Sequence, residues 1–241
     1  MLTSQIADCC KELRLSRNLA DMSSKVQAES NQEYLLQLLK YEIEHRDITR
    51  KDKLIKTAGF YTLKTFESFR FDEVTLPAAL TAESLKSLEF INSKTNLVMY
   101  GNVGTGKSHL SIALGVEACK KKLNVKFFRT SALVNKLAEA KKGGTLSTLM
   151  KQLSKADVLI FDEWGYVPLD RIGAQLLFEV ISECYERKTL IINTNIEFSR
   201  WVNVFYDEQM TGAIIDRLLH HCHLLLFPGQ SNRMRESGLM Q

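Results

Sequence analysis

The stretch Gly101-Asn-Val-Gly-Thr-Gly-Lys-Ser108 decides the fold, because it matches the pattern G-x-x-x-x-G-K-[ST] at every fixed position. An apolar run of strand length, residues 96–100, comes directly before it, and residues 107–120 have the apolar spacing of a helix. A glycine-rich turn in this context points its backbone N–H groups at phosphates, and the start of the helix adds a positive dipole end. We therefore expect Lys107 to reach the β- and γ-phosphates of a nucleotide and Ser108 to bind Mg²⁺. The expected nucleotide-binding residues of the loop are Gly101, Asn102, Val103, Gly104, Thr105, Gly106, Lys107 and Ser108.

Paired carboxylates follow a second apolar run. The run Val158–Phe161 ends directly in Asp162 and Glu163. A buried parallel strand would bring Asp162 beside the phosphate loop, where it can hold Mg²⁺ through water, and Glu163 would polarise a water for attack on the γ-phosphate. Two acidic side chains at the end of an apolar strand are costly to place there without a function. The pair predicts an ATPase with ATP and Mg²⁺ as its cofactors.

Two candidates for the hydrolysis step lie further along the chain. Asn195 ends a strand expected at 189–195, where its side chain would lie next to the γ-phosphate and orient the attacking water; the alternative is an asparagine that only forms the turn. Asn193 is expected inside that strand. Arg217 lies in a helix and could pair with Asp216 or another carboxylate of its own surface, or project into the nucleotide of a neighbouring subunit. The residues alone leave both roles of Arg217 open.

The alternation of patterns along the chain predicts its organisation. From residue 66 onward apolar strands alternate with helices, which predicts an α/β fold with a parallel five-stranded sheet between helices. Residues 1–65 contain one glycine and no proline, and their apolar residues recur at helical spacing, which predicts two or three amphipathic helices. We therefore expect a helical module for partner or DNA contact at 1–65 and a nucleotide-binding domain at 66–241. The other strands are expected at 125–129, 157–162 and 223–227, and the other helices at 145–155, at 171–187 and from a cap at Ser131 to Lys142.

The composition excludes several classes of protein. Of 241 residues, 45% are hydrophobic and 25% are charged, close to the average of globular domains, so neither a disordered nor a fibrous chain is expected. The longest apolar runs have strand length, which argues against a membrane helix. Five cysteines at irregular spacing argue against a disulfide framework and favour a reducing cytoplasm. The net charge of +4 is too small to decide whether nucleic acid is bound.

Basic residues nevertheless cluster. The run from His45 to Lys56 holds five basic and two acidic residues, which indicates either a solvated helix face or a surface for DNA phosphate or an acidic partner. No base-reading motif is present, so duplex DNA would be held largely without regard to sequence, through its phosphates, and released by salt. The run His220–His223 is not expected to hold a metal ion, because consecutive residues point to different sides of a helix or strand. Further candidate phosphate contacts are Lys120, Lys121, Lys122, Lys126, Arg129, Lys141 and Lys142.

Three stretches resemble a known family. Gly104–Leu110, Asp162–Asp170 and Ala213–His221 are similar to parts of IstB-like proteins, AAA+ ATPases of the DnaA/DnaC/IstB branch that help insertion sequences to transpose. The similarity covers about residues 66–241 strongly and the helical N-terminus in pattern only. Shorter runs that continue the match are Leu176–Phe178, Tyr185–Arg187, Asn195–Trp201 and Val204–Asp207.

The resemblance implies a fold, a reaction and partners. The fold would be an AAA+ P-loop core with no C-terminal lid or a minimal one. With ATP the protein would form an oligomer on duplex DNA in the bacterial cytoplasm and recruit or stimulate the transposase encoded by the same element, and hydrolysis would reset the assembly. By motif match, Asn195 takes the sensor-1 role and Arg217 that of the arginine finger. Arg233 would be a second sensor, although Asn232 stands before it where the family has Tyr.

Two other functions fit part of the pattern. A DnaC-like replicative helicase loader would combine the same ATPase core with single-stranded DNA and a helicase as its partner. A small-molecule P-loop kinase would act as a monomer, but Glu163 next to Asp162 argues against it. A preference for duplex over single-stranded DNA would separate a transposition helper from a helicase loader.

Overall fold

The computed structural model describes residues 2–205 and 207–236, which belong to two compact units. The first ends at Lys53 and the second begins at Leu54. We call them the helical unit and the sheet unit. The division lies within the segment 1–65 that the sequence analysis assigns to the N-terminal module. Ile55 and Phe60 account for this difference, because both pack against a core of the sheet unit.

The helical unit consists of helices, in line with its amphipathic pattern. Its last helix, α3, is continuous, so the charge-dense run from His45 to Lys56 lies on one helix and does not separate two. The buried apolar side chains among its described residues are Cys10, Leu19 and Ala20. The helices are α1 at Leu2–Glu12, α2 at Asn18–Met22 and α3 at Asn31–Ala58, whose last turn belongs to the sheet unit.

A buried carboxylate, that of Glu42 in α3, ties the helical unit together. The residue is 4% exposed and accepts hydrogen bonds from the backbone N–H of Ser16 at 2.9 Å, from the Ser16 hydroxyl and from Nε of Arg46 at 2.6 Å. Burial raises the pKa of Glu42, but these hydrogen bonds and the Arg46 charge outweigh it, so the pKa lies below its ordinary value. Polar contacts therefore help to hold this unit together beside its small apolar core.

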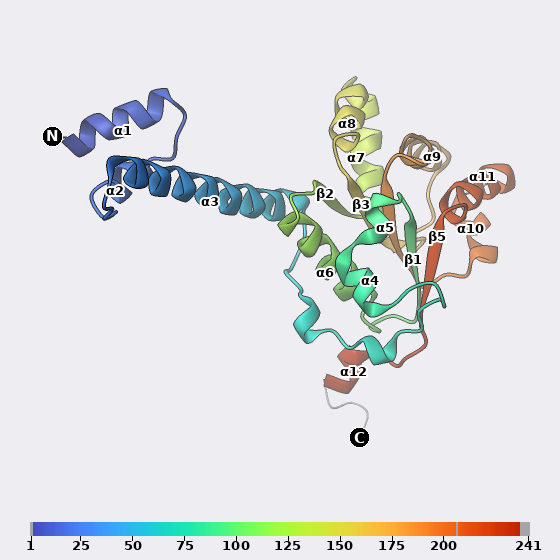
Figure 1. Cartoon of the computed structure of the whole chain (residues 1–241). Coiled ribbons are helices and arrows are strands. Elements are labelled where there is room, and N and C mark those ends of the chain that lie inside the picture. The colour runs from blue at the N-terminus through green and yellow to red at the C-terminus, as the bar shows by residue number, and fades with distance from the viewer. Residues whose placement is uncertain (1, 206, 237–241) are drawn as a thin grey trace. The chain divides into compact units, whose positions relative to one another are not determined.

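The sheet unit is built around five parallel strands in the order β2-β3-β4-β1-β5. Four of them, β1, β2, β3 and β5, are labelled in Figure 1. This arrangement confirms the predicted α/β fold with a parallel sheet between helices. Because the strands are parallel, their carboxyl ends meet at one edge of the sheet, where ligands bind in folds of this kind. The strands are β1 at Asn96–Gly101, β2 at Val125–Arg129, β3 at Val158–Trp164, β4 at Thr189–Thr194 and β5 at Cys222–Phe227.

Helices connect the strands. α6 runs from Lys107 to Lys120, as predicted. α7 begins at Thr130, so the expected cap at Ser131 is wrong; the Thr130 hydroxyl instead donates to the carbonyl of Asp162 at 2.9 Å and fixes this helix start on β3. Within the described residues, every helix is too short or too polar to span a membrane. The remaining helices are α4 at Ala82–Ser87, α5 at Glu89–Asn92, α8 at Leu146–Leu153, α9 at Arg171–Cys184, α10 at Val202–Phe205, α11 at Glu208–Leu219 and α12 at Asn232–Glu236, with 3-10 turns at Phe66–Ser68, Phe71–Glu73 and Phe198–Arg200.

Side chains of the strands alternate between two apolar cores, one on each face of the sheet. In β1, Val98 belongs to the core that includes α7 to α11, whereas Leu97 and Met99 belong to the core that includes α4, α5 and α6. β3 alternates in the same way, with Ile160 on one side and Phe161 on the other. The sheet is therefore buried on both faces, and its carboxyl edge is positioned by two packed layers.

Candidate nucleotide-binding site

The phosphate loop lies at the carboxyl edge of the sheet, between the end of β1 at Gly101 and the start of α6. Two of its glycines are required by close contacts. A Cβ at Gly101 would lie 2.2 Å from the carbonyl oxygen of Phe227, and a Cβ at Gly104 would lie 2.1 Å from Oγ of Ser231. Gly104 also has a φ of +80°, a conformation that favours glycine. The loop is therefore pressed against β5 and the residues after it, which fixes its course.

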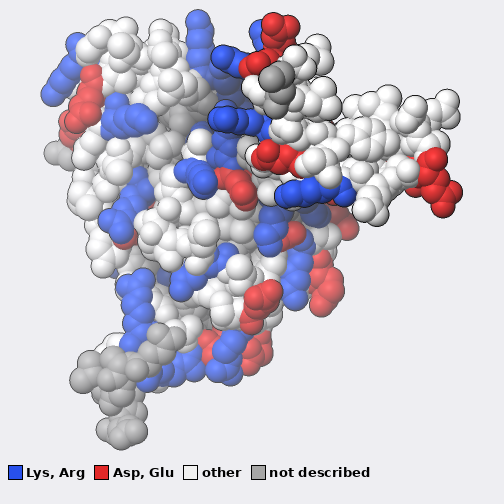
Figure 2. Space-filling model, turned by 90° about the vertical axis from the view of Figure 1, so that its left-hand side faces the viewer, with Lys and Arg blue, Asp and Glu red and all other residues white. Residues whose placement is uncertain are grey.

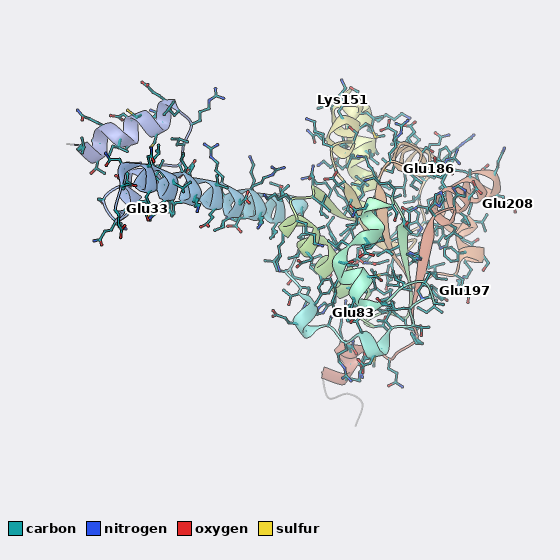
Figure 3. The ribbon with its side chains drawn as sticks, in the orientation of Figure 1. Glu33, Glu83, Lys151, Glu186, Glu197 and Glu208 are labelled. Carbon is teal, nitrogen blue, oxygen red and sulfur yellow. The ribbon has the colours of Figure 1, made fainter. Side chains whose placement is uncertain are left out.

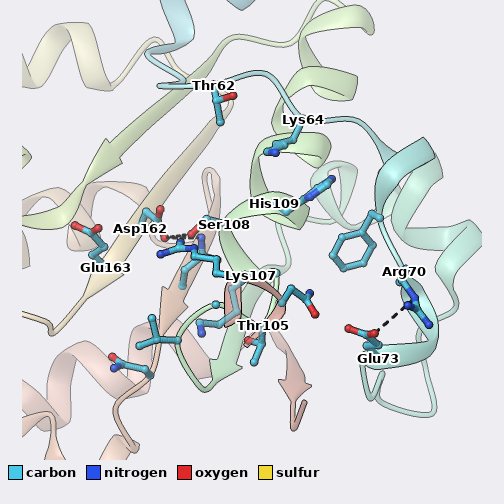
Figure 4. A pocket seen from close by; sticks show the side chains of 18 of the residues that line it. Thr62, Lys64, Arg70, Glu73, Thr105, Lys107, Ser108, His109, Asp162 and Glu163 are labelled. Carbon is cyan, nitrogen blue, oxygen red and sulfur yellow. Dashed lines mark hydrogen bonds and ion pairs between the residues drawn. The ribbon is translucent and has the colours of Figure 1, made fainter. Parts of the chain in front are cut away.

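A cavity of about 880 Å³ opens over this loop (Figure 4). Its volume is within the range of small-molecule and cofactor sites. Gly101, Asn102 and Arg217 are not among the residues that line it. The cavity does bring together the other predicted site residues, which are Val103, Gly104, Thr105, Gly106, Lys107, Ser108, Asp162, Glu163, Asn195 and Arg233.

Lys107 bends back onto the loop. Its Nζ donates to the carbonyl oxygens of Gly101 at 2.7 Å and Asn102 at 2.6 Å. Burial lowers the pKa of Lys107 to about 8; the Asp162 carboxylate acts in the opposite direction and the Arg233 guanidinium in the same one. A bound phosphate would favour the ammonium form, because the opposite charge stabilises it. The charge of this side chain is therefore coupled to occupation of the loop.

The Asp162 carboxylate is buried at the end of the apolar part of β3, with 4% of the residue exposed. Its Oδ1 accepts hydrogen bonds from the Ser108 hydroxyl at 2.8 Å and from the Asn193 side-chain amide at 2.9 Å. Asn193 lies inside β4, as expected, but sequence reasoning missed its contact with Asp162. No local sequence signal indicates this contact, because it depends on the pairing of Phe161 in β3 with Ile192 in β4, the residues that precede Asp162 and Asn193.

Glu163 lies beside a basic residue that the sequence analysis considered only for DNA. Oε2 of Glu163 is 3.9 Å from Nε of Arg129, which also lies over the ring of Tyr61 with its guanidinium carbon 5.5 Å from the ring centre. Glu163 has a φ of +57°, and the pairing of β3 with β4 shifts register between Phe161 and Trp164. This local bulge turns the Glu163 side chain out of the strand pattern and toward the end of β2.

The remaining predicted residues differ in their positions. Asn195 follows the last residue of β4, is exposed and lines the cavity. Arg233, in α12, also lines it. Arg217 donates from Nη1 to the carbonyl of Ala213 at 2.9 Å, and its guanidinium lies 5.0 Å from the ring centre of Phe178. No carboxylate among the described residues is within ion-pair distance of Arg217.

Ser108 and Asp162 provide the kind of oxygens that Mg²⁺ requires. Mg²⁺ usually keeps several waters and takes one or two protein oxygens together with those of a phosphate. Ser108 Oγ and Asp162 Oδ1 are 2.8 Å apart at the end of the phosphate loop. Oδ1 of Asn193, which lines the same cavity, is buried and has no hydrogen-bond partner among the described residues. An unused buried acceptor of this kind suits a water bound to the ion.

Known proteins match the chain over most of its length. The model of the family described as IstB-like ATP binding protein matches residues 10–239. A protein described as an ATP-binding protein of insertion sequence IS232, from Bacillus thuringiensis subsp. berliner, is 34% identical over 204 residues, 85% of this chain and 82% of that protein. One described as an ATP-binding protein of insertion sequence IS21, from Pseudomonas aeruginosa, is 35% identical over 204 residues, 85% of this chain and 77% of that protein.

A solved structure supports the fold. AMPPCP-bound DnaA from Aquifex aeolicus has a TM-score of 0.57 at 23% identity, over 71% of this chain and 52% of that chain. At this identity the likeness shows the fold alone, which is that of an AAA+ P-loop domain. The family model and the relatives reach further, because they extend through the phosphate loop and both carboxylates. The chain therefore belongs to the family of IstB-like ATP binding proteins.

Proposed function

We propose that the chain is an ATP-hydrolysing regulator of transposition, which assembles on duplex DNA with ATP and recruits or stimulates the transposase of its insertion sequence. One observation carries the enzymatic part of the proposal. Lys107, Ser108, Asp162 and Glu163 line a single cavity at the carboxyl edge of the sheet, in a chain of a family associated with insertion sequences.

Each residue of the cavity has a distinct part in the proposed hydrolysis. Lys107 binds the β- and γ-phosphates, and Ser108 and Asp162 hold Mg²⁺, which neutralises the charge that develops on the phosphate oxygens. Glu163 accepts a proton from the attacking water, and Asn195 orients that water. In the structure Glu163 faces Arg129, so this ion pair has to be exchanged for the water before hydrolysis. Arg233 adds a further positive charge on the same cavity.

A neighbouring copy completes the proposed site. Arg217 does not line the cavity of its own chain, and its guanidinium rests on Phe178. An arginine supplied by a neighbour stabilises the charge of the transition state and accelerates hydrolysis by several orders of magnitude. We therefore assign Arg217 to the nucleotide of the adjacent subunit, which makes hydrolysis depend on assembly.

The proposed DNA contacts are electrostatic. Several of the candidate lysines have local partners: Nζ of Lys121 donates to the carbonyl of Ser87 at 2.6 Å, and Nζ of Lys126 donates to that of Thr57 at 2.6 Å. Lys141 and Lys142 are exposed at the end of α7. On the face shown in Figure 2, Lys and Arg side chains are scattered with Asp and Glu between them. Contacts of these basic side chains with phosphates would hold DNA without base recognition.

The helical unit is the proposed contact for the transposase. Leu35, Leu39 and Ile43 follow one another at four-residue intervals along α3 and are 57%, 47% and 63% exposed. Residues at this spacing lie on one face of a helix, so they form an apolar stripe. Exposed apolar stripes of this kind are typical of surfaces that bind another protein.

The steady-state rate of ATP hydrolysis, measured without DNA, with duplex and with single strands at two salt concentrations, tests the proposal. We expect duplex to raise the rate and higher salt to remove the effect, while Lys107→Ala should have no activity in any condition. Stimulation by single strands alone would favour a helicase loader. If neither DNA raises the rate, the proposed DNA binding is contradicted. The proposed ATPase activity is then tested by comparing the hydrolysis rates of the wild type and Lys107→Ala without DNA.

A mixing experiment tests the role of Arg217. Glu163→Gln should bind ATP without hydrolysing it, and Arg217→Ala should bind ATP but lose hydrolysis that depends on assembly. When the two variants are mixed, the Glu163→Gln protein supplies its intact Arg217 to the intact cavity of Arg217→Ala. Part of the ATP hydrolysis should therefore return. A mixture as inactive as its two components would contradict action on a neighbouring subunit.

A further inference from the structure

Two histidines and a glutamate meet at the edge of the sheet opposite the nucleotide cavity. Glu186 lies in the turn between α9 and β4 and is labelled in Figure 3, and His220 and His221 lie between α11 and β5. Oε1 of Glu186 is 3.7 Å from Nδ1 of His220 and 3.8 Å from Nε2 of His221. One ligand atom from each residue lies within 4.8 Å of the others. These side chains precede the first residues of β4 and β5, so they belong to the amino edge of the sheet.

The backbone under this cluster is held by the buried side chain of Asn96. Its Nδ2 donates to the carbonyl of Leu218 at 3.0 Å, and its Oδ1 accepts from the backbone N–H of Leu190 at 2.9 Å. The backbone N–H of Asn96 donates to the carbonyl of His221 at 2.7 Å. One residue therefore links the end of α11, the start of β4 and the cluster itself, which limits the movement of the histidine backbone.

The turn that carries Glu186 is also ordered by hydrogen bonds. The carbonyl of Cys184 accepts from the backbone N–H of Arg187 and of Lys188, both at 3.0 Å. Glu186 has a φ of +57°, an unfavourable conformation for a residue other than glycine. The hydrogen-bonded turn thus holds Glu186 in a conformation that directs its carboxylate toward the two imidazoles.

From this geometry we propose that Glu186, His220 and His221 form a site for a divalent transition metal ion, of which Zn²⁺ is the most suitable. Imidazole nitrogens and carboxylate oxygens are preferred ligands of Zn²⁺, at about 2.0–2.2 Å, and tetrahedral coordination places neighbouring ligands a little over 3 Å apart. The two separations from Glu186, 3.7 and 3.8 Å, are close to this value, and all three ligand atoms lie within 4.8 Å of one another, so rotation of these exposed side chains can bring them to a common ion. Three protein ligands leave one position for water or for a side chain of a bound partner.

Tyr185 adds a polar group next to the proposed ion. Its hydroxyl lies 2.8 Å from Nδ1 of His220, and the two rings are 5.9 Å apart. An ion on this nitrogen would replace that hydrogen bond, and the hydroxyl would then be placed to bond a water on the ion. Polar groups that orient the ligands of a metal contribute to its affinity. The site would therefore include more than its three direct ligands.

The run His220–His223 was not expected to hold a metal ion, because consecutive residues of a helix or strand point to different sides. His220 and His221 lie in the turn between α11 and β5, where their ring centres are 4.2 Å apart, so that rule does not apply to them. The structure differs in two respects. Cys222 and His223 enter β5 and are not part of the cluster, and the third ligand, Glu186, comes from the turn after α9. Because Glu186 is far from the two histidines along the chain, no local sequence motif could have predicted the arrangement.

Binding of Zn²⁺ to the full-length, metal-free chain tests the proposal. Cys9→Ser is the background for all variants, because Cys9 is an exposed thiol that could bind Zn²⁺ elsewhere. Isothermal titration without nucleotide should show one saturable site. His221→Ala and Glu186→Gln should each lower the affinity at least about tenfold, as changes at metal sites commonly do. His223→Ala is the matched control and should bind like the background protein.

A second readout separates loss of the site from loss of the fold. Zn²⁺ should raise the thermal transition of the background protein but not that of His221→Ala, while both should unfold at similar temperatures without metal. Co²⁺ in the same site should give visible absorption bands without a thiolate charge-transfer band. The site does not depend on the proposed ATPase, so Lys107→Ala should bind Zn²⁺ normally. Absence of saturable binding, or Zn²⁺ affinities of His221→Ala and Glu186→Gln equal to that of the background protein, would overturn the proposal.

Discussion

The two units of the chain bury their apolar side chains to very different extents. In the sheet unit, strands and helices close two apolar cores, and Leu97, Val98 and Met99 of β1 have no exposed surface. In the helical unit, the carboxylate of Glu42 occupies the interior, while Leu35 and Leu39 of α3 remain half exposed. The sheet unit therefore has a self-sufficient core, whereas the helical unit leaves apolar side chains exposed.

This difference suits the two tasks that we propose. A nucleotide site needs side chains held to within a fraction of an ångström, and buried strands on both sides of Asp162 provide that support. A docking helix needs accessible apolar groups, which a self-sufficient core would have hidden. The two units should therefore respond separately to substitutions.

The largest expected contrast is between two leucine-to-alanine variants, one in each unit. Leu97→Ala leaves a cavity under the sheet and should lower the free energy of unfolding of the sheet unit by about 2–5 kcal/mol. Leu39→Ala removes a side chain that is 47% exposed and should change the stability of the helical unit by less than about 0.5 kcal/mol. Both tryptophans, Trp164 and Trp201, are buried in the sheet unit, so denaturant unfolding followed by fluorescence reports on this unit alone, and circular dichroism reports on both. Equal decreases in the free energy of unfolding of the two variants would contradict the difference between the two units.

ATP should stabilise the sheet unit and leave the helical unit unchanged. ATP should raise the thermal transition seen by tryptophan fluorescence in the wild-type chain, because ligand binding stabilises the folded state. Lys107→Ala removes the main counter-charge of the phosphates and should weaken ATP binding about 100-fold or more, which corresponds to about 2.7 kcal/mol. Lys120→Ala, at the far end of the same helix, is the control and should bind ATP normally. Wild-type affinity in Lys107→Ala would refute the assignment of the phosphate loop.

Acid should affect the helical unit through Glu42. Because the pKa of Glu42 is lower in the folded chain than its ordinary value of 4.5, its contribution to stability is present above that value and is lost as the pH falls through the folded pKa. Glu42→Gln should lower the stability of this unit by about 1–3 kcal/mol at neutral pH and remove part of its acid sensitivity. Glu44→Gln, on an exposed position of the same helix, should change neither. Circular dichroism of the helical transition between pH 3 and 7 measures both effects, and indistinguishable Glu42→Gln and Glu44→Gln proteins would contradict the proposed role of the buried carboxylate.

Much of the sheet unit could be predicted from the sequence because its signals are local. The phosphate loop fixes the end of β1 and the start of α6, and apolar runs followed by polar residues mark the other strands. The contacts of Asp162 with Asn193 and of Glu163 with Arg129 could not be read in the same way. Both depend on the strand order β2-β3-β4, which places three segments side by side that are far apart along the chain. No local pattern encodes that order.

The helical unit was harder to predict for a different reason. The apolar spacing predicts two or three helices in residues 1–65, but the charge-dense run from His45 to Lys56 does not indicate whether one helix continues through it. In the structure α3 continues through it, since Arg46, Arg50 and Lys53 are all compatible with a solvated helix. The burial of Glu42 could not be predicted either, because its carboxylate is stabilised in part by Ser16, which is distant along the chain and contacts α3 only in the folded unit.

The smallest expected effect is a decrease in the ATP affinity of the sheet unit at alkaline pH. The helical unit should show no corresponding change. With a pKa of about 8, Lys107 is mostly charged at pH 7.5 and mostly neutral at pH 9. Since phosphates bind the ammonium form, ATP affinity should fall somewhat less than tenfold over this range, and binding near pH 8.5 should take up a fraction of a proton.

Isothermal titration in two buffers of different ionisation enthalpy measures that uptake directly. Lys107→Arg carries a charge that is not lost at these pH values, so it should bind ATP without taking up the proton. Uptake of equal size in Lys107→Arg and the wild type would assign the proton to another group. In the helical unit the pH-dependent carboxylate, that of Glu42, titrates at acidic pH. The circular dichroism of this unit should therefore stay constant from pH 7.5 to 9. The two units would then be distinguished by the direction in which pH acts on each.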